Sequence, residues 1–142
     1  MIVYLDTSAL VKLFFEEQHS AQVQQWVSAS AIGVVSQLAW TEVCAAIAMK
    51  RRIGQASASQ CLSALSLLRE DWARFHRLGT DAELFDEAGE LALSHDLRAY
   101  DGVQLASARR AWLAAGAALV FCSFDKQLNA AARTLGLSVL EP

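Results

Sequence analysis

Short apolar segments alternate with long segments of helix-forming residues along the whole 142-residue chain. The apolar segments have the length of β-strands and are continuous, as strands buried on both faces are; they span residues 2–5, 32–35, 75–79, 118–122 and 137–140. The segments between them are rich in Ala, Leu, Gln, Glu and Arg, and predict helices at 9–17, 20–29, 37–52, 56–74, 81–94, 101–115 and 126–135. This order predicts an α/β fold, a three-layer α/β/α sandwich with a mostly parallel central sheet, because right-handed crossovers place helices on both faces.

The length and composition fit a single domain over residues 1–142. A chain of this length buries about two thirds of its unfolded surface in one core, and no linker-like segment divides it. Hydrophobic residues make up 54% of the chain and charged residues 19%, which excludes a disordered protein. Because the apolar content is high for a lone monomer, we expect a homodimer.

The sequence predicts a cytoplasmic protein with no membrane partner. The longest uncharged apolar segment, residues 111–122, is far shorter than the roughly 20 residues that a bilayer requires, and no signal peptide is recognisable. Three dispersed cysteines, Cys44, Cys61 and Cys122, lack metal-site spacing and are expected to be free thiols. The net charge of −3 excludes a strong overall attraction to nucleic acid, so any such contact must be local.

Four acidic residues interrupt strongly apolar surroundings: Asp6, Glu42, Asp101 and Asp125. Asp6 directly follows the first predicted strand, and Asp125 follows the fourth with two residues between. Ligands of parallel sheets bind at the carboxyl ends of the strands, so we expect these side chains to lie close together. Two like charges about 4 Å apart cost roughly 4 kcal/mol at an effective dielectric of 20, and only a proton or a cation relieves that repulsion.

Three of these acids also have structural explanations, which the sequence leaves open. Asp6 and Asp125 could cap the helices that follow them, and Asp101 could be a first-turn acid favoured by the helix dipole. Glu42 has no such explanation, because its neighbours on the same helix face are all apolar: Leu38, Ala39, Ala45 and Ala46. Glu42 is therefore expected to be buried or nearly so, which favours a shared polar site over an isolated structural glutamate.

The chemistry of this acidic set predicts a Mg²⁺ or Mn²⁺ site. Carboxylate oxygens select hard cations, and the chain has no cluster of His or Cys that would favour zinc. A cation so held can activate water, orient a phosphodiester and stabilise the charge on the departing oxygen. The sequence therefore predicts metal-dependent nuclease chemistry.

The order and spacing of four segments resemble those of PIN-domain ribonucleases, most closely the VapC-like toxins of bacterial type II toxin–antitoxin pairs. The resemblance spans essentially the whole chain and rests on residues 5–10, Ser36 with 42–43, 95–108 and 123–137. It implies that Asp6, Glu42 and Asp101 hold the main metal and that Asp125 completes the acidic pocket. It also implies accessory hydrogen bonding by Ser123 and Ser8, although a helix cap is an equal alternative for Ser8.

The same resemblance implies a reaction and a partner. A metal-activated water would attack an RNA phosphodiester, leaving a 5′-phosphate and a 3′-hydroxyl. A cognate antitoxin would cover the acidic groove, and DNA would be bound only through that antitoxin. The alternative is a catalytically silent PIN-like binding subunit that regulates DNA with its partner. A phosphohydrolase of small phosphoesters is disfavoured, because no Asp-x-Asp follows the first strand and no Gly-rich phosphate loop is present.

Several other residues permit two interpretations. The basic residues 50–52 and 109–110 could contact phosphates, but those at 50–52 are also typical of the last turn of a helix, which we favour. Gly102 stands where such toxins often carry Ala, at a cost of up to about 1 kcal/mol in helix propensity. Trp40 could shape an interface, although core packing is favoured. The remaining aromatic candidates could stack unpaired bases: Tyr4, Tyr100, Trp26, Trp72 and Trp112. For Trp112, a place in the core or a dimer interface is favoured, because it continues the helical spacing of Asp101, Leu105 and Ala108.

Overall fold

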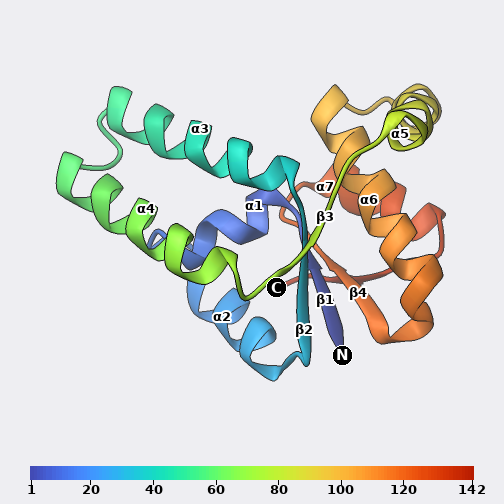
Figure 1. Cartoon of the computed structure of the whole chain (residues 1–142), viewed down its shortest axis with the longest axis horizontal. Coiled ribbons are helices and arrows are strands. Elements are labelled where there is room, and N and C mark those ends of the chain that lie inside the picture. Colours follow the sequence, from blue (N-terminus) through green and yellow to red (C-terminus); the bar gives the residue numbers. More distant parts are fainter.

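The structure is a computed structural model that describes all of residues 1–142 (Figure 1). Five strands form one sheet, in the order β3-β2-β1-β4-β5, and every pairing is parallel. The strands are β1 (Ile2–Leu5), β2 (Ile32–Ser36), β3 (His76–Leu78), β4 (Leu119–Cys122) and β5 (Ser138–Leu140). All five predicted strands are present, and the prediction of an α/β fold around a parallel sheet is confirmed.

Seven α-helices and two short 3₁₀ helices connect the strands: α1 (Thr7–Leu10), η1 (Val11–Leu13), α2 (Ser20–Ala29), α3 (Leu38–Arg52), α4 (Ala58–Trp72), α5 (Ala82–His95), α6 (Ala99–Ala115), η2 (Gly116–Ala118) and α7 (Lys126–Thr134). None of these helices combines the length and apolar character needed to cross a membrane.

The first predicted helix, 9–17, was wrong in its bounds. The helix begins at Thr7, because the Asp6 side chain caps it, and helical structure ends with η1 at Leu13. Beyond that point the Ser20 hydroxyl donates to the carbonyl of Phe15 at 2.9 Å and accepts from the amide of Glu17 at 3.0 Å. These local hydrogen bonds give the backbone a turn in place of further helix.

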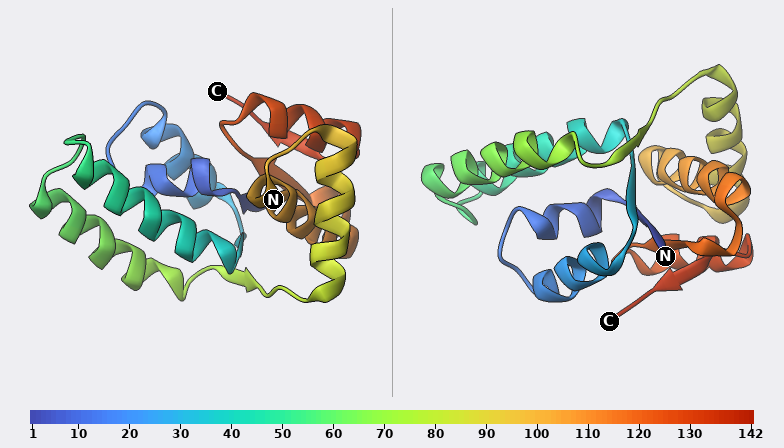
Figure 2. Two further views of the ribbon diagram at one scale, coloured as in Figure 1. Left: turned by 90° about the horizontal axis from the view of Figure 1, so that it is seen from above. Right: turned by 60° about the horizontal axis from the view of Figure 1, so that its bottom comes forward.

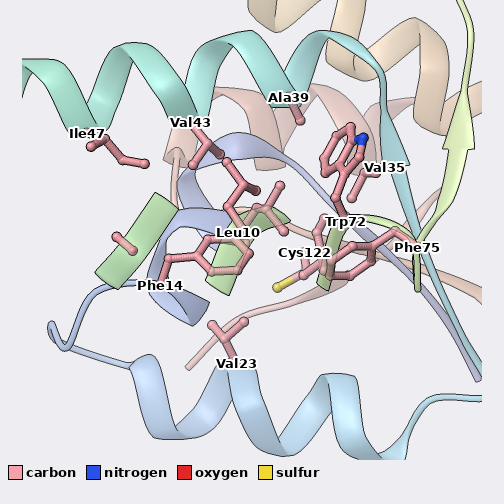
Figure 3. Packing of buried hydrophobic residues seen from close by; sticks show 14 of the residues in the cluster. Leu10, Phe14, Val23, Val35, Ala39, Val43, Ile47, Trp72, Phe75 and Cys122 are labelled. Carbon is pink, nitrogen blue, oxygen red and sulfur yellow. The ribbon is translucent and has the colours of Figure 1, made fainter. Parts of the chain in front are cut away.

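The two faces of the sheet are covered by different helices, which gives the three predicted layers (Figure 2). Val3 and Leu5 of the central strand β1 belong to a core of 17 buried residues, formed with α1, α2, α3 and α4. Figure 3 shows part of this core, with Leu10 of α1, Val23 of α2 and Val43 of α3. Tyr4, between Val3 and Leu5, points into a second core of 15 buried residues, formed with α5, α6 and α7. The central strand is thus buried on both faces, which explains why its sequence is continuously apolar.

Gly102 allows α6 to lie unusually close to α5. A Cβ atom at this position would be 2.8 Å from the carbonyl oxygen of Ala88 and 3.4 Å from the Cβ of Ala92. The Ala88 oxygen belongs to the backbone of α5 and cannot move aside as a flexible side chain could. The helix-propensity cost of this glycine is therefore accompanied by a packing requirement that the sequence did not reveal.

We expect Gly102→Ala to lower the free energy of unfolding by about 1–3 kcal/mol, because overpacking outweighs the gain in helix propensity. Gly89→Ala on α5 is a matched control, because Gly89 is exposed and a Cβ there would meet no atom within 4 Å. That change should raise stability by up to about 1 kcal/mol. Urea unfolding followed by circular dichroism measures both, and equal stabilisation by the two changes would contradict the close approach.

Candidate active site

The carboxyl ends of β1, β2 and β4 lead into one acidic cavity. The strand order reverses between β1 and β4, and ligands of open α/β sheets bind at such a switch point. Leu5 and Cys122 are the last residues of the neighbouring strands β1 and β4, and they pair in register. The residues that follow them, Asp6 and Ser123, therefore lie side by side. A cavity of about 560 Å³ lies at this edge, lined by Asp6, Thr7, Ser8, Val11, Glu42, Ala46, Met49, Arg98, Ala99, Tyr100, Asp101, Gln104 and Asp125. The structure thus brings all four predicted acids together.

Asp6 is the most deeply buried of the four acids, with only 4% of its surface exposed. Its Oδ1 accepts hydrogen bonds from the Ser8 hydroxyl at 2.7 Å and the Ala9 amide at 3.0 Å, and its Oδ2 accepts from the Ser123 hydroxyl at 2.8 Å. Burial raises the pKa of Asp6 to about 6, although these hydrogen bonds oppose the rise. Asp6 therefore caps α1, as the capping interpretation predicted, and it also lines the cavity shared with the other three acids.

Ser8 and Ser123 tie the loop after β4 to the start of α1. The Ser123 hydroxyl accepts from the amide of Asp125 at 3.1 Å, and the Ser8 hydroxyl accepts from the amide of Phe124 at 2.8 Å. Ser8 lies inside the first turn of α1, whose cap is Asp6, so the alternative that Ser8 caps the helix is wrong. Each serine donates to Asp6 and accepts from the loop that carries Asp125.

Glu42 on α3 is partly buried, less than the prediction of a buried or nearly buried residue. Its Oε1 accepts hydrogen bonds from the Thr7 hydroxyl and from Nε2 of Gln104, both at 2.8 Å. These neutral donors, from α1 and α6, were missed because they lie 35 and 62 positions from Glu42 in the sequence. The spacing of Gln104, three residues after Asp101 and so on the same face of α6, could have placed it near Asp101 but not beside Glu42.

Tyr4 fixes the orientation of Gln104. Its hydroxyl donates to Oε1 of Gln104 at 2.7 Å, which leaves the amide nitrogen of Gln104 to donate to Glu42. Burial raises the pKa of Tyr4 well above its ordinary value, so this phenol remains a hydrogen-bond donor. Tyr4 is fully buried, and the prediction that it could stack on a base is wrong.

Asp101 and Asp125 line the same cavity, and their negative charges repel each other. Asp101 lies in the first turn of α6, and burial, followed by the charge of Asp125, raises its pKa. Asp125 caps α7, because its Oδ1 accepts from the Leu128 amide at 2.9 Å. The Arg98 guanidinium lies near both carboxylates, with Nε 3.6 Å from Oδ2 of Asp101 and Nη2 3.7 Å from Oδ2 of Asp125.

The donor set fits a hard divalent cation by its chemistry. Four carboxylates and no thiol or imidazole line the cavity, which is the set of ligands that Mg²⁺ and Mn²⁺ prefer. In this conformation no three His, Cys, Asp or Glu side chains are arranged to hold one ion together. The nearest cation to Asp101 and Asp125 is the Arg98 guanidinium.

Three of the other five basic candidates serve structural roles, whereas Arg51 and Arg52 take part in no ion pair. Lys50, in the last turn of α3, pairs with Glu17 at 3.0 Å. Arg109 pairs with Glu87 at 2.6 Å, and Arg110 pairs with Asp81 at 3.2 Å, so both hold α6 against α5 or its cap. These partners satisfy the three cations within the chain.

Most of the aromatic candidates belong to the cores. Trp72 is buried and therefore cannot stack on a base as the sequence had suggested. Trp40 packs on it with ring centroids 5.4 Å apart, in agreement with the favoured core role. Tyr100, in contrast, is 61% exposed and lines the acidic cavity. It is the aromatic side chain best placed to meet a ligand there.

A larger cavity, of about 740 Å³, lies between α3 and α4. Its lining is mainly apolar, with Arg51, Arg52 and Arg69 among its residues, and includes no carboxylate. Without a carboxylate that can hold a hard cation, it offers none of the predicted chemistry. The acidic cavity is therefore the candidate active site.

Comparison with known proteins agrees with this architecture. The family model of the PIN domain matches residues 3–134. Ribonuclease VapC46 of Mycobacterium tuberculosis is 33% identical over 140 residues, covering 99% of this chain and 97% of that protein. Among solved structures, Mycobacterium tuberculosis VapC20, described as a Sarcin-Ricin loop cleaving toxin, superposes with a TM-score of 0.69 at 16% identity, covering 99% of each chain.

A second solved structure, a toxin–antitoxin complex from Klebsiella pneumoniae, has a TM-score of 0.67 at 17% identity and covers 99% of this chain and 97% of that one. At such identities the structural likeness shows the fold alone. The family model and the curated relative cover nearly the whole sequence. The chain belongs to the PIN-domain family and, within it, to the VapC ribonucleases.

Proposed function

We propose that this protein is a Mg²⁺- or Mn²⁺-dependent endoribonuclease and the toxin of a toxin–antitoxin pair. The observation that carries the proposal is the convergence of Asp6, Glu42, Asp101 and Asp125 on one cavity at the switch point of the sheet. Membership in the VapC ribonucleases agrees with it. The cavity has no His, Cys or Lys that could act as a nucleophile or general base, so its chemistry depends on carboxylates.

Asp6, Glu42 and Asp101 would hold the cation, with Asp125 completing the set. The bound cation would supply an activated water for attack on an RNA phosphodiester and would stabilise charge on the departing oxygen. The neighbouring residues orient the carboxylates: Ser8 and Ser123 hold both oxygens of Asp6. Carboxylates fixed in this way would hold the reacting groups in place, so that the protein itself need not form a covalent bond to the RNA.

Glu42 is oriented in the same way from two other elements. Thr7 and Gln104 both donate to its Oε1, which leaves Oε2 without a donor from the protein. One oxygen is thus fixed by hydrogen bonds while the other remains available to a ligand in the cavity. The arrangement is that of a carboxylate held in place by its supporting residues.

We propose three further properties with this function. The partner is a cognate antitoxin that covers the acidic cavity, and DNA is bound only through it. The protein forms a homodimer, which its exposed large apolar side chains favour, Leu93 among them. It acts in the cytoplasm, where three unpaired cysteines would remain reduced. Light scattering of the purified chain measures the dimer directly.

Cleavage of a mixed pool of structured RNA by the antitoxin-free protein tests the function. We expect fragments in Mg²⁺ or Mn²⁺ that disappear in EDTA, and sequencing of their ends should show 5′-phosphates. Calorimetry with Mn²⁺ on the same preparation shows whether the folded protein binds metal. Metal binding without cleavage of any RNA in the pool would favour the catalytically silent binding subunit over the enzyme.

A further inference from the structure

The acidic cavity contains a single basic side chain. Arg98 lies at the N-cap position of α6, one turn before Asp101, and is the only Lys, Arg or His among the residues that line the cavity. Its side chain is 86% exposed, and its contacts to Asp101 and Asp125 are 3.6 and 3.7 Å long. These are longer than the 2.6 Å contact of Arg109 with Glu87. Exposed, loose ion pairs contribute little to stability, so Arg98 is free to leave its partners.

The position of Arg98 does not serve the fold in another way. It caps α6 only through its backbone, because its side chain makes no capping hydrogen bond. Asp6 and Glu42 obtain their hydrogen bonds from serine, threonine, glutamine and backbone groups. Arg98 therefore compensates the charge of Asp101 and Asp125 alone, the two acids that a cation in the cavity would also neutralise.

An RNA substrate must bring a negatively charged phosphate toward four carboxylates. The guanidinium group has five donors in a planar fork, which matches two oxygens of a phosphate. Once a divalent cation neutralises the carboxylates, a phosphate becomes the best remaining partner for Arg98. No other basic group lines the cavity to take this role.

We propose that Arg98 is a phosphate-binding residue of the RNA site, and that without metal it is the counterion of Asp101 and Asp125. The inference rests on the proposed function, since it assigns a residue to the RNA. In the metal-free protein Arg98 competes with the divalent cation. In the metal-loaded protein it contacts an RNA phosphate beside the reacting centre.

The metal part is tested by Mn²⁺ calorimetry on the wild type, Arg98→Gln, Arg98→Lys and Arg74→Gln. Removing the competing charge in Arg98→Gln should lower the Kd for Mn²⁺ by about three- to tenfold, whereas Arg98→Lys keeps the charge and should bind nearly as the wild type does. Arg74→Gln is the control, because Arg74 is 74% exposed and pairs only with Asp71. Equal Mn²⁺ affinity in the wild type and Arg98→Gln would overturn the counterion role.

The phosphate part is tested with a short fluorescein-labelled single-stranded RNA and Ca²⁺-loaded protein, with the RNA checked for intactness afterwards. Binding is followed by fluorescence anisotropy at several salt concentrations. Arg98→Gln should weaken binding several-fold and reduce the slope of log K against log salt by about 0.7, the value for one phosphate contact on a single strand. A change in packing alone would not move that slope. Absence of wild-type binding, or an unchanged slope, would overturn the phosphate role.

Both tests measure binding and need no cleavage, so they separate the two proposals. If Mn²⁺ and RNA binding respond as expected while the wild type cleaves no RNA, the nuclease is wrong and the assignment of Arg98 stands. If the wild type cleaves RNA and Arg98→Gln binds both ligands as the wild type does, the nuclease stands and the assignment of Arg98 is wrong.

Discussion

Asp101→Asn is expected to reduce metal-dependent RNA cleavage by about a thousandfold or more and to leave the fold intact. The carboxylate is one of the proposed ligands of the cation, and metal catalysis contributes several kcal/mol to the barrier, each 1.36 kcal/mol being tenfold in rate. Burial and the charge of Asp125 raise the pKa of Asp101, so its ionised form is disfavoured in the folded state. Asn is isosteric and uncharged, and its stability should equal or exceed that of the wild type.

Initial rates on the RNA pool and urea unfolding of the same preparations measure this pair of effects. Asp86→Asn is the matched control, because Asp86 is an exposed acid on α5 that takes part in no ion pair or side-chain hydrogen bond. It should cleave RNA as the wild type does. If Asp101→Asn lost activity together with its helical circular dichroism, the residue would be structural, and a role in catalysis alone would be contradicted.

The fold could be predicted because each central strand is buried on both faces. Residues 2–5 are apolar at every position, and in the structure Val3 and Leu5 face one core while Tyr4 faces the other. The bounds of the first helix could not be predicted, because they depend on a cap by Asp6 and on hydrogen bonds of Ser20 across a turn. Such side-chain contacts form only when the chain folds back on itself.

The acids of the site could be predicted because parallel strands end at a common edge. Asp6 and Asp125 follow neighbouring strands, and their capping roles proved compatible with a shared cavity, since each uses one oxygen for the cap. The sequence could not show Thr7 and Gln104 as partners of Glu42, because these residues lie 35 and 62 positions away. Likewise, the sequence showed Gly102 only as a cost in helix propensity. The atom that requires a glycine there, the carbonyl oxygen of Ala88, belongs to another helix.

The ion pairs of Arg98 could likewise be predicted only in part from the sequence. Its spacing of one turn from Asp101 is visible in the sequence, but its approach to Asp125 depends on how α6 and α7 meet at the sheet edge. Short-range pairs on a helix are readable from spacing. A cation shared between two elements is a property of their packing.

In metal-free protein, Asp6 should make stability depend on pH in the direction opposite to that of an ordinary paired acid. Its pKa is about 6 in the folded state against an ordinary value of 3.8, so the folded state binds the proton more tightly than the unfolded state does. The contribution of Asp6 to stability is therefore greatest below pH 3.8 and is lost as pH rises through about 6, by about 3 kcal/mol in all. Asp6→Asn lacks this charge while its amide oxygen can still cap α1.

The difference in unfolding free energy between the wild type and Asp6→Asn isolates this one group. In EDTA, lowering the pH from 7.5 to 5 should shift that difference by about 1.4 kcal/mol in favour of the wild type, because Asp6 takes up its proton within this range. At pH 7.5, Mn²⁺ should stabilise the wild type far more than Asp6→Asn, since a bound cation relieves the same buried charge. A pH-independent difference would mean that the three hydrogen bonds to Asp6 already compensate its burial, and the carboxylate would then need no cation to remain ionised.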